Sequence, residues 1–158
     1  MSKTEKMVDL LARIVLAEGN EPAAVDELKS MLNEKNPRQD RESIECVAEK
    51  LMFEVGVPCH IMGFGNLVKA ITFVVDNPVL RYSIIKVYTM VAEEVGGEST
   101  GSRVERSIRH AVSSAFDRCD SDVLFKYFGN TIDPNKGKPT NAEFISTMAR
   151  EVQYRLTC

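Results

Sequence analysis

A chain of 158 residues with 44% hydrophobic side chains is the size of one compact domain and can bury a core. No run approaches the ~18 uninterrupted apolar residues of a membrane span, and the N-terminus lacks the apolar stretch of a signal peptide. The four cysteines are far apart and form no CxxC pair, which argues against a zinc ribbon or a thioredoxin-type motif. We expect a soluble cytoplasmic protein with reduced thiols, no membrane association, no cofactor and no metal.

The net charge of −3 at first argues against a nucleic-acid partner, because neutralising phosphates takes a basic surface. The distribution of charge weakens this objection. Residues 1–95 carry 11 Lys and Arg against 15 Asp and Glu, whereas residues 96–158 carry 9 against 8. A local basic face in the second part can therefore bind DNA, with a modest nonspecific affinity that falls steeply with salt.

Apolar residues recur at helical spacing along almost the whole chain, and no segment alternates convincingly like a strand, so the sequence predicts an all-α fold. The first helical repeat, Met7, Leu10, Leu11, Ile14 and Val15, stops at Gly19 and Asn20. Pro22 then suits the first turn of a second helix that reaches about Asn33. Together the two helices make an N-terminal helical hairpin.

Residues 36–41 are polar and contain Pro37, which is typical of a linker between the hairpin and the rest of the chain. We place a domain boundary there. The sequence thus predicts a hairpin extension over residues 1–40 and a second domain over residues 41–158.

Apolar repeats predict three further helices: one over residues 44–52 closed by Gly56, one around residues 67–74 that ends near Pro78, and one over residues 80–95. Gly96 and Gly97 end the third, and after a polar turn another helix begins at Ser102. Two helices joined by a short glycine-containing turn form a helix-turn-helix pattern. We expect a multi-helix bundle that contains a helix-turn-helix, although this pattern alone seldom indicates DNA binding.

The helix that begins at Ser102 has a well-defined start and two different faces. Ser102 can cap the first turn while Glu105 reaches back to its amide, which is the capping-box pattern. At about 100° per residue, one stripe is apolar and consists of Val104, Ile108, Ala111, Val112 and Ala115. The other side gathers Arg103, Arg106, Arg109, His110 and Ser113. We expect the first face to pack and the second to be cationic, with basic residues in the turns that reach base edges in a recognition helix.

The arginines suit base recognition, because a guanidinium can bond O6 and N7 of guanine, and Glu105 could accept from a cytosine amino group. The competing interpretation is an ordinary solvated face, in which Glu105 serves only the cap and the arginines form surface ion pairs that contribute little. The helix alone does not decide between the two. His110 is either a phosphate contact, which we favour, or a half-buried polar residue.

A second basic feature is the loop with Lys136 and Lys138, which is followed by a helix whose Thr140 and Glu143 form another capping box. Lysines and helix N-terminal amides both suit phosphate oxygens, so this loop is a candidate clamp on the DNA backbone. A solvated Lys-Gly-Lys loop without a function is at least as common. The loop alone carries no conclusion.

Three separated blocks of sequence are more specific when taken together: residues 102–111 (SRVERSIRHA), 128–129 (FG) and 137–145 (GKPTNAEFI). In this order they resemble the C-terminal effector domain of the stage 0 sporulation protein A family, the master regulator of endospore initiation in Firmicutes. Residues 56–58 and 63–67 look like the family's opening helices. The similarity runs from about residue 44 to residue 156.

The resemblance implies a six-helix DNA-binding domain in which bases are read by Glu105, Arg106 and Arg109. It implies that the DNA backbone or groove edges are held by Ser102, Arg103, His110, Lys138 and Asn141, to which the basic loop adds Lys136 and Thr140. In the family two such domains usually bind adjacent boxes. We therefore expect a homodimer or tandem pair on double-stranded DNA, with self-association through the helix over residues 141–156.

The family's usual member begins with a phosphoacceptor receiver domain, whereas residues 1–40 of this chain are predicted to be a helical hairpin. The leading hypothesis is therefore a sequence-specific transcription regulator that lacks receiver control, with the hairpin as a dimerisation or partner-docking element. The alternative is a protein-interaction module or antagonist that pairs with a full-length relative without productive DNA reading. The acidic first part of the chain favours this alternative.

An enzyme is the third class considered, and we do not expect one. Cys59 and His60 form the only adjacent nucleophile and base, and neighbours in sequence face apart on a helix. We expect Cys59 to be packed and His60 to be exposed, with no catalytic residue and no small-molecule substrate.

Overall fold

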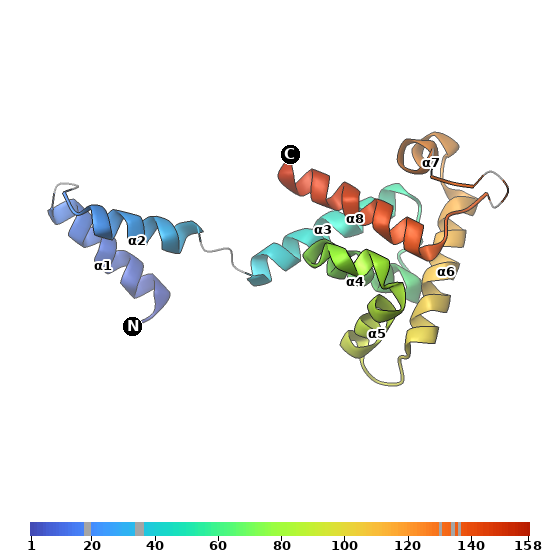
Figure 1. Cartoon of the computed structure of the whole chain (residues 1–158), viewed down its shortest axis with the longest axis horizontal. Coiled ribbons are helices and arrows are strands. Elements are labelled where there is room, and N and C mark those ends of the chain that lie inside the picture. Colours follow the sequence, from blue (N-terminus) through green and yellow to red (C-terminus); the bar gives the residue numbers. More distant parts are fainter. Residues whose placement is uncertain (18–19, 34–36, 130, 134, 136) are drawn as a thin grey trace. The chain divides into compact units, whose positions relative to one another are not determined.

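The computed structural model describes residues 1–17, 20–33, 37–129, 131–133, 135 and 137–158. Within these residues every regular element is a helix, which confirms the predicted all-α fold (Figure 1). The chain divides into two compact units, Met1–Asp40 and Arg41–Cys158. We describe each unit by itself.

The first unit is the expected helical hairpin, in which α1 (Lys3–Leu16) packs against α2 (Pro22–Asn33). Ser2 caps α1 in a capping box with Glu5. Lys6 of α1 forms an ion pair with Glu27 of α2, and Arg13 of α1 forms one with Glu21, the residue before α2, each with a nitrogen–oxygen distance of 2.8 Å. The hairpin core is small, because its only fully buried hydrophobic side chains among the described residues are Leu10 and Ala24. The expected stop at Gly19 lies outside the described residues.

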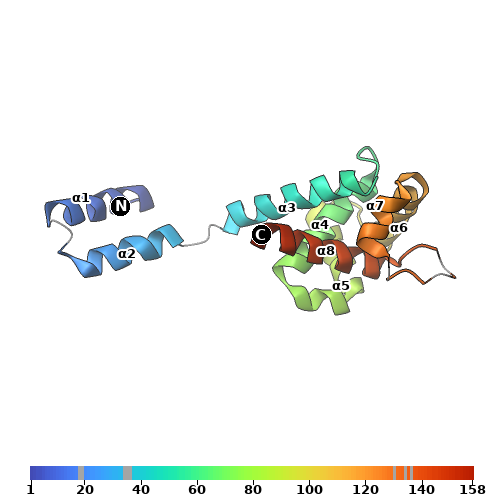
Figure 2. The ribbon, with the colours of Figure 1, turned by 90° about the horizontal axis from the view of Figure 1, so that it is seen from above.

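The second unit is built around a central helix, α4 (Met62–Asp76), which contacts α5 (Ile84–Val95), α6 (Gly101–Arg118) and α8 (Asn141–Thr157) (Figure 2). Residues along most of the length of α4 are buried, including Leu67, Ile71 and Val74. The other elements are α3 (Pro37–Glu54), the 3-10 helix η1 (Pro78–Tyr82) and α7 (Ser121–Phe128).

Two expectations about where helices begin are wrong. The linker predicted over residues 36–41 is helical from Pro37 onwards, because proline is accepted in the first turn of a helix, where its missing N–H would have no partner; Asn36 lies outside the described residues. The helix predicted over residues 80–95 is divided. Residues up to Tyr82 form η1, and α5 begins only after Ser83.

A close approach of α4 to α6 fixes the position of α6. A Cβ atom added to Gly63 would lie 2.2 Å from the carbonyl oxygen of Ser107 and 2.7 Å from the Cβ of Ala111, so only glycine fits there. The buried side chain of Asn66 donates a hydrogen bond of 2.7 Å to the hydroxyl of Ser107. A steric fit and a directional bond therefore set where α6 lies on the core.

A polar cluster joins the C-terminal ends of α3, α7 and α8. Both guanidinium NH groups of Arg155 donate to the carboxylate of Glu54 at 2.8 Å, and the hydroxyl of Tyr127 donates to the same carboxylate at 2.8 Å. The hydrogen bonds from Arg155, followed by that from Tyr127, lower the pKa of Glu54 to about 2 despite partial burial. The C-terminal helix is thereby anchored by a charged clamp.

Candidate nucleic-acid interface

Helix α6 divides into the two faces that its sequence predicts. Its buried residues are Val104, Ile108, Ala111, Val112 and Ala115, which are the members of the predicted apolar stripe. On the other side the structure places Ser102, Arg103, Arg106, Arg109 and His110 as exposed residues. One side of α6 therefore packs on the core while the other presents an exposed cationic surface.

The turn before α6 joins it to α5, and the two helices pack against each other. Gly96 and Gly97 have φ angles of 74° and 62°, a left-handed conformation that glycine adopts at little cost. The predicted cap at Ser102 is wrong. Helix α6 begins at Gly101, and the N-cap is Thr100, whose side chain accepts from the backbone N–H of Arg103.

Because Thr100 is the N-cap, Glu105 does not form the predicted capping box with Ser102. Its carboxylate forms an ion pair with Arg109, one turn further along the same face. The side chain of Arg109 is nevertheless 70% exposed. The pair presents an acceptor and a set of donors side by side on the surface of α6.

The other two arginines differ in how they are held. Arg103 donates to the backbone carbonyl of Glu98 at 2.9 Å, which ties it to the turn before the helix. The side chain of Arg106 is exposed and has no hydrogen-bond or ion-pair partner among the described residues. Its full set of guanidinium donors is therefore available to a ligand.

A groove of about 390 Å³ brings together residues that are far apart in sequence. It is lined by Ile84 and Tyr88 of α5, by Glu105, Arg109, Val112 and Ser113 of α6, and by the segment from Lys138 to Ala142. Five of the sequence-predicted site residues line it: Glu105, Arg109, Lys138, Thr140 and Asn141. The two blocks of residues 102–111 and 137–145 thus form one surface.

Asn141 holds this surface together. Its side-chain amide donates to the hydroxyl of Tyr88 at 3.1 Å and to the backbone carbonyl of Glu105 at 3.2 Å. The start of α8 is thereby fixed against α5 and α6. Thr140 caps α8, and its capping box with Glu143 confirms the prediction.

Lys138 lies beside α6, where its ammonium group donates to the hydroxyl of Ser113 at 3.1 Å and to Asp117 at 2.7 Å. These contacts hold a cation at the rim of the groove. Lys136, the other lysine predicted for this loop, lies outside the described residues.

Sequence reasoning missed Tyr88 and Asp117. Burial raises the pKa of Tyr88, although the hydrogen bond from Asn141 acts in the opposite direction, so its phenol keeps its proton and can donate into the groove. Nothing in the sequence distinguishes Tyr88 from the core residues around it, since it stands beside Val87 on the packed side of α5. No local sequence pattern indicates the role of Asp117 either, because its partner Lys138 is 21 residues away.

The exposure of two other side chains bears on the predictions. His110 is exposed, which removes the alternative of a half-buried polar residue. Cys59, expected to be packed, is exposed together with His60, because both follow the end of α3 in the connection to α4.

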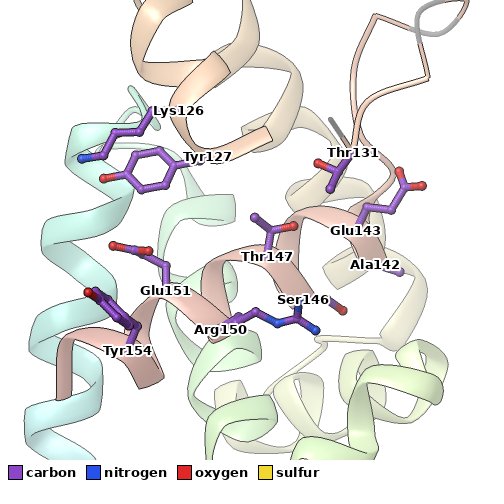
Figure 3. A pocket seen from close by; sticks show the side chains of 10 residues that line it. All are labelled: Lys126, Tyr127, Thr131, Ala142, Glu143, Ser146, Thr147, Arg150, Glu151 and Tyr154. Carbon is purple, nitrogen blue, oxygen red and sulfur yellow. The ribbon is translucent and has the colours of Figure 1, made fainter. Parts of the chain in front are cut away.

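A larger cleft of about 700 Å³ lies between α7 and α8 (Figure 3). It is lined by Lys126, Tyr127, Thr131, Ala142, Glu143, Ser146, Thr147, Arg150, Glu151 and Tyr154, none of which the sequence analysis assigned to the site. Its two cations are balanced by two carboxylates, a poor match for a polyanion.

Comparison with known families decides the relationship. Residues 48–152 match the family described as sporulation initiation factor Spo0A C terminal. The chain belongs to this family. The match confirms the resemblance predicted from the three blocks, and it makes residues 48–152 a DNA-binding effector domain of a regulatory family that is not a known enzyme family.

The site residues of this Spo0A C-terminal domain, residues 102–141, lie well inside the match, whereas the hairpin lies outside it. No described helix is both long and apolar enough to cross a bilayer. The described residues also hold no group of three or more His, Cys, Asp or Glu side chains suited to binding a metal ion.

Proposed function

We propose that the chain is a sequence-specific transcription regulator of the cytoplasm that reads the major groove of double-stranded DNA with the N-terminal half of α6. The observation that carries the proposal is the geometry of this helix. Its apolar stripe is buried on the core while Arg106 and Arg109 are exposed in its first turns. Recognition helices place the same turns against base edges.

Three side chains share the reading of bases in this proposal. The side chain of Arg106 donates to O6 and N7 of a guanine. It breaks no existing side-chain bond to a described residue when it does so. Arg109 and Glu105 act as a pair, with spare donors of the guanidinium on a second guanine and the carboxylate accepting from a cytosine amino group. Each rigidifies the other, which lowers the entropy lost on binding.

The remaining site residues hold phosphates. On α6 the exposed residues are Ser102, Arg103 and His110. Lys138 lines the groove together with Thr140 and Asn141, which stand at the start of α8. Helix N-terminal amides and lysines both bind phosphate oxygens. Lys136 belongs to the same set by its place in the sequence. We propose that two copies bind adjacent boxes, as a homodimer or a tandem pair.

The test is a titration of a labelled duplex with the full chain, followed by fluorescence anisotropy. The duplex carries sequences selected by the protein from a random pool, and a scrambled duplex of the same composition is the control. The Arg106→Ala, Arg109→Ala double variant is expected to lose about 1 to 3 kcal/mol for each guanine contact. Arg150→Ala, in the cleft between α7 and α8, is the matched control and keeps the affinity of the wild type. Equal affinity of the double variant and the wild type would refute the proposal.

A second candidate function is a protein-interaction module or antagonist that pairs with a relative without productive DNA reading. It is favoured by the ion pairs on the surface, since Glu105 neutralises Arg109 and Asp117 neutralises Lys138. Size-exclusion chromatography with and without the selected duplex distinguishes the two. A stable protein complex that does not shift the duplex would support this second function.

A further inference from the structure

The hairpin of α1 and α2 has a core too small for its size. Of the described hydrophobic side chains only Leu10 and Ala24 are fully buried, at 2% exposure each. The unit ends at Asp40, and units of about 40 residues or fewer usually need a disulfide, a metal or a partner chain to stay folded. Residues 1–40 contain neither cysteine nor histidine, so this segment has no disulfide and none of the Cys and His ligands that form structural zinc sites.

The exposed part of α1 carries an apolar row, which is bordered by the exposed charged residues Glu5 and Asp9. Met7, Leu10 and Ile14 lie on the side of the helix that also carries the ion-paired Lys6 and Arg13, toward α2. A second row, Val8, Leu11 and Val15, stands 60%, 48% and 73% exposed. Thr4 and Ala12 complete this row at about 100° per residue, so no charged side chain falls within it.

The spacing of this row is that of a surface that packs against another helix. Thr4, Val8, Leu11 and Val15 follow one another at intervals of four, three and four residues, the spacing of a seam that packs against another helix. Because the row holds no charge, two copies meet without like-charge repulsion, and nothing in it selects a charged partner. We propose that α1 packs against the α1 of a second copy of this chain, so that two hairpins form a four-helix bundle.

Such a contact is isologous, and a residue near the middle of the seam then lies close to its own counterpart. Leu11 is that residue. The contact does not involve α6 or the groove, so it goes beyond the proposed function and stands whether or not the chain reads DNA.

Sedimentation equilibrium of the full chain without DNA tests this inference. The wild type is expected at twice the chain mass of 17.7 kDa, with dissociation to the monomer on dilution. Leu11→Glu places two unpaired carboxylates in an apolar seam and is expected to weaken the dimer about a hundredfold or more. Val79→Glu adds the same charge at a residue of η1 that is 70% exposed, and the dimer is expected to persist.

A pair of variants with opposite charges distinguishes loss of the dimer contact from loss of the fold. Leu11→Lys alone is expected to be monomeric, and an equimolar mixture with Leu11→Glu is expected to recover the dimer mass. A monomeric wild type, an unaffected Leu11→Glu dimer or a mixture that does not recover would each overturn the inference. Dissociation caused by Tyr154→Glu but not by Leu11→Glu would instead place the interface on α8 and overturn it as well.

The two proposals fail separately. Leu11→Glu keeps the affinity of one domain for a duplex with a single box, because α6 is untouched. The Arg106→Ala, Arg109→Ala variant keeps the dimer mass. Loss of DNA binding without loss of the dimer therefore contradicts only the proposed function.

Discussion

The groove beside α6 and the cleft between α7 and α8 are both hollows on the same unit, and both include the first turn of α8. The cleft is the larger, at about 700 Å³ against about 390 Å³. The two hollows differ in the charged residues around them. The cleft balances Lys126 and Arg150 against two carboxylates, whereas the groove lies beside the exposed arginines of α6. For a polyanionic ligand the exposed donors matter more than the volume of the hollow.

Among the variants that separate the groove from the cleft, Gly63→Ala is expected to have the largest effect. The new Cβ meets the backbone of α6 at Ser107, so α6 must shift away from α4, at a cost of about 1 to 3 kcal/mol in the free energy of unfolding. DNA affinity is expected to fall with it, while the cleft keeps its lining. Gly65→Ala is the control, since no atom lies within 4 Å of its added Cβ, and it is expected to be neutral or to stabilise the helix by up to about 1 kcal/mol. Urea unfolding measures both variants, and equal losses for the two would contradict the packing argument.

A smaller effect is expected from Lys138→Ala, which removes a cation from the rim of the groove. The magnitude of the negative slope of log affinity against log salt concentration is expected to decrease by about 1, because one phosphate contact is lost for every sequence alike. Lys126→Ala removes a cation from the cleft and is expected to leave the slope unchanged. Anisotropy titrations over a salt series give both slopes. An unchanged slope for Lys138→Ala would exclude this lysine from the phosphate contacts.

The smallest effect concerns the clamp at the far end of α8. The pKa of Glu54 falls from 4.5 to about 2 in the folded chain, so its carboxylate stabilises the fold above pH 4.5. This stability is expected to be lost as the pH falls through that window toward about 2, because protonation then weakens the bonds to Arg155. Glu54→Gln is expected to lose about 1 kcal/mol at neutral pH, since the pair is partly exposed to solvent. Thermal unfolding between pH 5 and about pH 2 checks the expectation, and a Glu54→Gln curve parallel to the wild type would contradict it. DNA affinity at neutral pH is expected to change little.

Periodicity predicted the buried stripe of α6, because Val104, Ile108 and Ala115 are apolar at a spacing that only a helix places on one side. It misplaced the start of the helix. Thr100 and Ser102 are both good capping residues, and the acidic residue at Glu105 favoured Ser102. In the structure Glu105 instead pairs with Arg109, which the one-turn spacing equally allows.

The contacts that assemble the surface could not be predicted from the sequence, because they join distant segments. Asn141 meets Tyr88 across 53 residues, and Arg155 meets Glu54 across 101. Local patterns contain no information on such pairs. The resemblance to the family supplied four residues of the groove, namely Glu105, Arg109, Lys138 and Asn141. Only the packing of α4, α5 and α8 explains why they meet.

The most direct test of base reading by α6 is a cycle that combines Arg106→Ala with 7-deazaguanine, which lacks the N7 acceptor, at successive guanines of the selected duplex. If Arg106 bonds a guanine, the substitution at that guanine weakens binding of the wild type but causes little further loss in Arg106→Ala. The coupling should appear at one position of each box and should be absent for Arg150→Ala. Losses that simply add at every guanine would contradict the account.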